Sequence, residues 1–317
     1  MAFHQLEALS PAAVQALADT CEAVITAEGR EPATERERQQ QQHLFQLLLG
    51  QPWPQQVAAA VPVGLSGFIT TKRQRQEVMQ LLTVLAFLEP RLDQAKLQVL
   101  ERVAVALQVE PQMVANLEEL CRGHVLRAFS DIYRRTFHEL NNEGMVQGFS
   151  RFILPMLGLG IDHVHLEKYQ ALASAPEGSF GAALHAYYAT TALPFPGSRN
   201  GLPYPYLAMH DVHHVIGGYG IDYIGEQRVL AFTMGLFPDH ALLIGLPGML
   251  QFQMGIADPL AASVAPKLKD QLDPPLFARE LERGAATIGP IRNFHWDFWT
   301  WIERPLAEVR RDLNVLN

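Results

Sequence analysis

The sequence MHDVHHVIGG, residues 209–218, places four potential metal ligands among apolar residues. In a helix each residue turns about 100° and rises about 1.5 Å, so His210 and His214 lie one turn apart on the same face. The two histidines of HExxH zinc helices have this spacing, although here Asp211 follows the first histidine. The stretch therefore predicts a helix that holds a cation between two imidazoles.

Helical geometry also ranks the other side chains of this stretch. Asp211 lies about 60° from His214 around the helix axis, whereas His213 lies about 100° from it. We therefore predict His210, Asp211 and His214 as ligands, together with the downstream carboxylate Glu226. His213 is expected to support the site from behind. If the helix is distorted near its glycine-rich end, His213 can replace Asp211 as a ligand.

Glycines at positions 217, 218 and 220 end the predicted helix and turn the chain. A second helical pattern then opens with Glu226, and eleven residues separate it from His214. A carboxylate in the first turn of a returning helix can complete the site. Nitrogen and oxygen ligands favour Zn²⁺, and two histidines with a carboxylate also suit Fe²⁺, with Mn²⁺ as a further candidate. The alternative interpretation is that these histidines are ordinary surface or core side chains.

The spaced pattern of His210, Asp211, His214 and Glu226 resembles the signature of the coenzyme Q biosynthesis protein 4 family. Flanking segments support the resemblance, which covers residues 165–317, about half of the chain. These segments are GSFG at 178–181, LPFPG at 193–197, FHWD at 294–297 and RPLAEVRRDL at 304–313.

The resemblance implies a prenylated benzoquinone precursor as substrate, head-group decarboxylation at C1 with replacement by hydroxyl, and other quinone-biosynthesis proteins as partners. A bound cation can act as a Lewis acid in such chemistry, and one carboxylate, Asp211 or Glu226, can serve as general base. Apolar residues at 232–254 are expected either to form the core or to line a groove for the prenyl tail. A non-catalytic prenyl-lipid carrier or scaffold with a structural metal is one alternative. A metal-dependent hydrolase is another, although the eleven-residue gap to Glu226 and the matching flanks argue against it.

Composition narrows the functional classes further. The chain has 317 residues, 48% of them hydrophobic, and a net charge of −8, which argues against a nucleic-acid binder. Cys21 and Cys121 fit neither a disulfide framework nor a metal motif, so we expect a reduced, cytoplasmic chain. The longest apolar run, residues 241–254, is too short for a transmembrane helix and contains Pro247. Peripheral membrane contact and homo-oligomer formation stay open.

The first part of the chain reads as successive helices. Ser10 caps a helix over residues 11–25, Thr71 caps a second, and a third begins near Asp93. No stretch shows the sustained alternation of a strand. We therefore predict an all-α fold with a helical bundle at 1–157 and a larger metal-binding domain at 158–317, joined at the glycine-rich sequence LGLG of residues 157–160.

Residues 76–109 weakly resemble the helical repeat of tellurite-resistance protein B-like domains. In that family acidic residues are implied in cation binding, and Glu89, Asp93 and Glu101 stand nearest to those places. The usual Asp-Gly of the turn between the helices is replaced here by Glu89 and Pro90. We therefore predict an interaction or scaffold role for this part of the chain.

Overall fold

Side-chain caps define where the N-terminal helices begin. Ser10 Oγ accepts a hydrogen bond from the Ala13 amide at 3.2 Å, and Pro11 occupies the first helical position, so α2 (Pro11–Ile25) starts where the sequence predicts. Thr71 forms a reciprocal capping box at the start of α5 (Lys72–Ala86), and Asp93 caps α6 (Gln94–Ala106).

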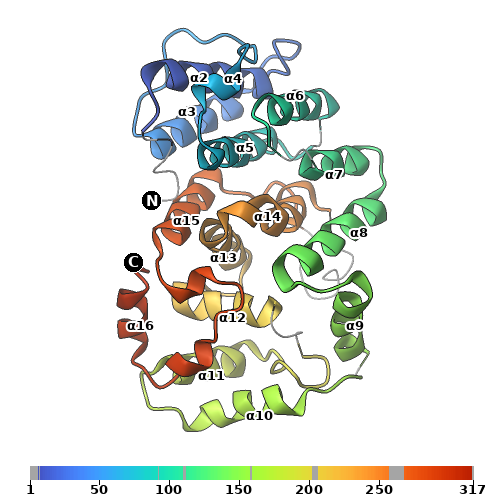
Figure 1. Cartoon of the computed structure of the whole chain (residues 1–317), viewed down its shortest axis with the longest axis vertical. Coiled ribbons are helices and arrows are strands. Elements are labelled where there is room, and N and C mark those ends of the chain that lie inside the picture. Colours follow the sequence, from blue (N-terminus) through green and yellow to red (C-terminus); the bar gives the residue numbers. More distant parts are fainter. Residues whose placement is uncertain are drawn as a thin grey trace.

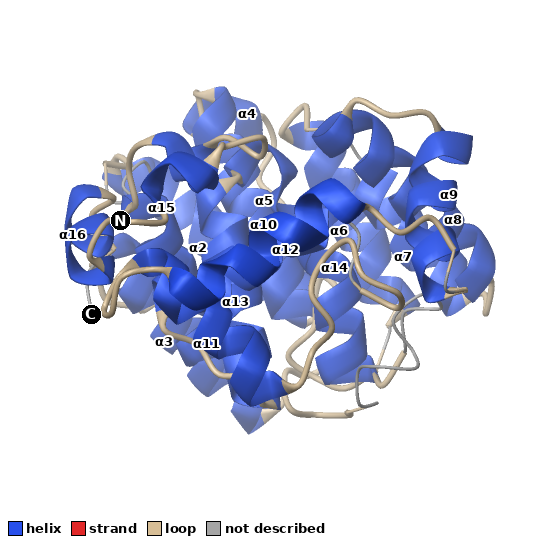
Figure 2. Ribbon diagram, turned by 90° about the horizontal axis from the view of Figure 1, so that it is seen from below, coloured by secondary structure: helices blue, strands red, loops and turns tan. Residues whose placement is uncertain are grey.

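This computed structural model describes residues 6, 8–91, 93–109, 112–157, 159–201, 206–256 and 268–315. Within them the fold is all-α (Figure 2), and the one strand-like pairing is an isolated bridge between Ser179 and Pro305. The remaining helices of the first half are α3 (Glu35–Leu49), α4 (Leu65–Phe68), α7 (Gln112–Cys121), α8 (Val125–Arg135) and α9 (Met145–Met156). The second half contributes α10 (His163–Ala171), α11 (Phe180–Thr191), α12 (Tyr206–Gly217), α13 (Tyr223–Leu236), α14 (Ala241–Met249), α15 (Pro274–Ala286) and α16 (Leu306–Asp312).

Helices α2 to α6 gather at one end of the molecule, α13 to α15 lie in the middle, and α10, α11, α12 and α16 lie toward the other end (Figure 1). Helices α13 and α15 cross in close contact at Gly235 and Gly284. A Cβ on Gly235 would lie 2.1 Å from the Leu281 carbonyl oxygen, and one on Gly284 would lie 2.0 Å from that of Phe232. Glycine is therefore required at this crossing, which fixes α13 against α15.

The boundary predicted between residues 157 and 158 adjoins Gly158, which lies outside the described residues. Helices from both sides of it share one buried apolar cluster.

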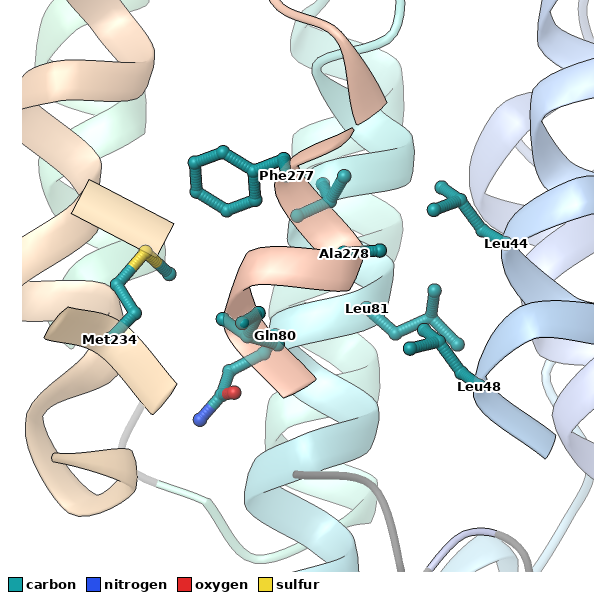
Figure 3. Close-up of a pocket in the computed structure, with 9 residues that line it drawn as sticks. Leu44, Leu48, Gln80, Leu81, Met234, Phe277 and Ala278 are labelled. Carbon is teal, nitrogen blue, oxygen red and sulfur yellow. The ribbon is translucent and has the colours of Figure 1, made fainter. Parts of the chain in front are cut away.

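Figure 3 shows a small cavity where α3 and α5 meet α13 and α15. Its volume of about 20 Å³ accommodates roughly one water molecule, and its lining is almost entirely apolar. We assign it no ligand-binding role.

The apolar residues that the sequence placed near the site lie mainly in the core. Met209, Phe232, Met234 and Met249 are each at most 2% exposed. For these residues the core interpretation is confirmed.

No single described helix is long and apolar enough to cross a membrane. Tyr223–Leu236 and Pro238–Met254 meet that criterion only as a pair, across a bend of 112°.

Candidate metal centre

Helix α12 carries both candidate histidine ligands on one face. It ends at Gly217, and Gly218 follows with a φ of +74°, so the predicted glycine stop is confirmed. The Nε2 atoms of His210 and His214 lie 3.1 Å apart. The His214 side chain is fully buried, whereas that of His210 is 29% exposed.

The third donor comes from the first turn of α13. Asp222 caps this helix by accepting a hydrogen bond from the Gly225 amide at 2.8 Å, and Glu226 follows directly. One Glu226 carboxylate oxygen, Oε2, lies 3.3 Å from His210 Nε2, and the other, Oε1, lies 3.4 Å from His214 Nε2. His210, His214 and Glu226 thus form the one three-residue group among the described histidines, cysteines and acidic residues whose donor atoms all lie within 4.8 Å of one another. We call this group the His–His–Glu triad.

The spacing within the triad can be compared with that of a real metal site. Zinc binds histidine nitrogen and carboxylate oxygen at about 2.0–2.2 Å, so neighbouring corners of a tetrahedron around it lie about 3.3–3.6 Å apart. The two imidazole nitrogens lie 3.1 Å apart, and each lies 3.3 or 3.4 Å from a different oxygen of Glu226, so the separations are close to these edges although both carboxylate oxygens take part. The donor types and their spacing therefore fit one divalent cation and leave one tetrahedral corner without a triad ligand.

Hydrogen bonds from the two imidazoles stabilise the Glu226 carboxylate. Burial raises the pKa of the Glu226 carboxyl, but hydrogen bonds from His210 and His214 outweigh burial and lower this pKa to about 2. Burial lowers the pKa of His210, whereas its hydrogen bond to Glu226 raises it, and the net shift is upward. Since a metal binds an unprotonated imidazole nitrogen, its binding would displace the protons that these nitrogens donate to Glu226.

Asp211, the fourth predicted ligand, faces two tyrosines. The Tyr188 hydroxyl donates to Asp211 Oδ2 at 2.5 Å, and the Tyr187 hydroxyl donates to Oδ1 at 3.2 Å. Burial raises the pKa of Asp211, while the neighbouring His210 charge and the Tyr188 hydrogen bond lower it, and burial prevails. The structure therefore brings three of the four predicted ligands together and directs the fourth carboxylate to α11.

The two tyrosines are residues that the reasoning from helical spacing missed. Neither tyrosine was predicted from the sequence as a site residue. The ring of Tyr187 also lies against that of His214, with centroids 5.5 Å apart. Adjacent tyrosines on an otherwise apolar helix were the available signal, but their partner on α12 is visible only in the fold.

His213 lies apart from the triad, in the core. Thr233 donates its hydroxyl proton to the Val229 carbonyl at 2.7 Å, so it accepts the proton from His213 Nδ1 at 2.9 Å. The imidazole packs between Phe232 and Phe237. Burial is the main cause that lowers the pKa of His213 to about 3, so this ring is neutral. His213 therefore supports α12 by packing it onto α13.

No family model, curated protein or solved structure matches the chain. The fold and the site define an all-α protein with a histidine- and glutamate-lined cluster between α12 and α13. Its function must therefore be argued from that cluster and from the sequence patterns around it.

Proposed function

We propose that this chain binds one divalent transition metal ion through His210, His214 and Glu226. Zn²⁺ is the first choice, with Fe²⁺ and Mn²⁺ as alternatives, because two imidazoles and one carboxylate suit all three ions. The observation that carries the proposal is that one donor atom from each of the three side chains lies within 4.8 Å of the other two, with each carboxylate oxygen of Glu226 close to one histidine nitrogen. Three protein ligands with one remaining position are typical of catalytic and not of structural zinc.

The proposed substrate is a prenylated benzoate-type head group, which rests on the resemblance to the coenzyme Q biosynthesis protein 4 family. A metal bound at the triad would supply Lewis acidity toward a carboxylate or phenolate oxygen of that head group. Loss of CO₂ with a proton taking its place needs no oxidant. Replacement by hydroxyl also needs a two-electron oxidant such as dioxygen, for which iron would be the suitable metal.

The protein's own carboxylates have different parts in this proposal. Both oxygens of Glu226 face histidine nitrogens, so Glu226 holds the metal and is not free to act as a base. Asp211 lies beside the triad with its pKa raised by burial, a shift toward the range of a useful general base. Its hydrogen bond with Tyr187 gives a route for moving a proton at the edge of the site.

Metal analysis of the purified protein tests the site directly. Wild-type protein should hold about one ion per chain after reconstitution, and the His210→Ala, His214→Ala double variant and the Glu226→Gln variant should hold none. His124→Ala is the matched control, because His124 is an exposed histidine 53% open to solvent. A wild-type protein that stays free of metal refutes the proposal.

The Asp211→Asn variant separates two versions of the site. If Asp211 acts only beside the triad, this variant keeps its metal and loses turnover of a prenylated benzoate. If it loses the metal as completely as Glu226→Gln, then Asp211 is a fourth ligand. A metal-loaded wild type without turnover favours the carrier or scaffold alternative, and turnover of phosphoesters or peptides favours the hydrolase.

A further inference from the structure

The last turn of α12 has four carbonyl groups that no residue of the helix can satisfy. They belong to residues 214–217, and each has a partner from outside the helix. The His214 carbonyl accepts from the Tyr219 amide at 2.9 Å. The Val215 and Ile216 carbonyls both accept from Arg310, and the Gly217 carbonyl accepts from Arg283. The end of the helix is therefore fully hydrogen-bonded, and most of its donors come from distant parts of the chain.

Arg310 makes the larger share of these contacts. It lies on α16, and its guanidinium donates through Nε to the Ile216 carbonyl at 2.9 Å and through Nη2 to the Val215 carbonyl at 3.0 Å. Arg283 on α15 donates to the Gly217 carbonyl at 2.8 Å. A planar guanidinium that reaches two carbonyls at once fixes direction as well as distance. Its positive charge also lies at the favourable, carboxyl end of the helix dipole.

The adjoining glycine leaves the space that this arrangement needs. A Cβ on Gly218 would lie 3.2 Å from Arg310 Nη2, which is a tight contact. Gly218 also has a positive φ, which glycine adopts without strain. Gly218, which directly follows the last residue of α12, therefore also leaves room for the Arg310 guanidinium at the end of the helix.

Arg310 contacts the turn that carries His214 but not the turn that carries His210. His214 belongs to the last four residues of α12, next to the two carbonyls that Arg310 holds. His210 lies one turn earlier and meets Glu226 from there. We infer that Arg310 is a positioning residue of the metal site: it holds the last turn of α12 so that His214 Nε2 stays within ligand distance of His210 and Glu226. This inference rests on the proposed function.

Cobalt(II) binding tests the inference, because a tetrahedral cobalt site has a strong visible absorption that reports its geometry. The test variant is Arg310→Gln, with Arg310→Lys as the conservative change. The matched control is Arg311→Gln, since Arg311 is the next residue of α16 and is 72% exposed. We expect Arg310→Gln to weaken cobalt binding about 10- to 100-fold, the usual effect of losing an outer partner of a ligand, and to alter the absorption band. Arg310→Lys should recover part of the affinity, and Arg311→Gln should match the wild type.

A second readout needs no metal. In the metal-free protein the ¹⁵N resonances of the imidazoles should change more for His214 than for His210 in Arg310→Lys and Arg310→Gln. General destabilisation would not single out one of the two rings. If the wild type binds no cobalt, the proposed function fails and the imidazole resonances still decide whether Arg310 holds His214. If the cobalt affinity and the ¹⁵N resonances of both imidazoles are the same in Arg310→Gln as in Arg311→Gln, the inference is wrong.

Discussion

Two buried groups of ionisable side chains distinguish the two halves of the chain. In the first half, Lys96 of α6 donates to Glu37 of α3, with side chains only 4% and 2% exposed. The other Glu37 oxygen accepts from the Thr34 amide at 2.8 Å. In the second half, the His–His–Glu triad joins α12 and α13 with three potential metal donors that face one another.

The difference lies in whether charge is balanced within the group. Glu37 and Lys96 neutralise each other and serve only to join two helices. In the triad two imidazole nitrogens lie against one carboxylate and 3.1 Å from each other. The buried Glu37–Lys96 pair has its charges matched within the protein, whereas three donor atoms within 4.8 Å of one another are suited to binding a cation.

The largest effect is expected when the balanced pair is broken. Lys96→Met leaves the Glu37 carboxylate buried without its counter-charge, and loss of one partner of a buried pair typically costs about 3–5 kcal/mol. The free energy of unfolding from urea titration should fall by this amount. Metal content should stay unchanged.

The double variant Glu37→Gln, Lys96→Met is the control for this prediction. The side-chain amide introduced at position 37 would keep an oxygen for the Thr34 amide without burying a charge. The double variant should therefore be more stable than Lys96→Met alone. Equal losses in both variants would mean that packing, and not charge, accounts for the effect.

Local chemistry explains how much of the fold was predictable. The caps at Ser10, Thr71 and Asp93 act within three residues of themselves, so the sequence marks these helix starts correctly. The glycine stop of α12 and the place of Glu226 in the first turn of α13 are local in the same sense. Packing between distant helices leaves no such local mark, and the crossing of Gly235 with Gly284 could not be predicted.

In the site, too, local features were predictable from the sequence and contacts between helices were not. Helical spacing correctly places His210 and His214 on one face, because that angle depends only on sequence separation. The angle also puts Asp211 near that face, but it cannot show that Tyr187 and Tyr188 of α11 donate to its carboxylate. Those hydrogen bonds depend on how two helices pack.

Glu77 on α5 is a buried carboxylate with a partner for only one of its two oxygens, and its titration predicts that folding stability depends on pH. Arg73 donates to one of its oxygens, and the other is buried without a partner in the described structure. Burial raises the pKa of Glu77 from 4.5 to about 7, against the opposing effect of Arg73. Between these two values the unfolded chain ionises while the folded chain stays protonated, so folded stability is full below pH 4.5 and falls as pH rises to about 7.

The Glu77→Gln variant should lack this part of the pH dependence. Because the Glu77 side chain is buried, the wild type should lose about 3 kcal/mol relative to the variant across the interval. Urea titrations at a series of pH values measure the difference between the two proteins, which removes contributions from other groups. A constant difference throughout the interval contradicts the prediction.

The smallest expected effect on stability comes from removing a helix cap. It tests whether the start of α13 holds Glu226 in place for metal binding. Asp222→Ala removes the cap of α13, and Ser10→Ala removes the equivalent cap of α2. Each loss should lower the free energy of unfolding by about 1 kcal/mol.

Only Asp222 precedes a proposed ligand, because Glu226 lies in the turn that this cap orders. Asp222→Ala should therefore also weaken zinc binding, by about tenfold in a chelator competition assay, while Ser10→Ala leaves it unchanged. Equal zinc affinity in the two variants would show that Glu226 is held by its histidine partners alone and does not depend on the start of its helix.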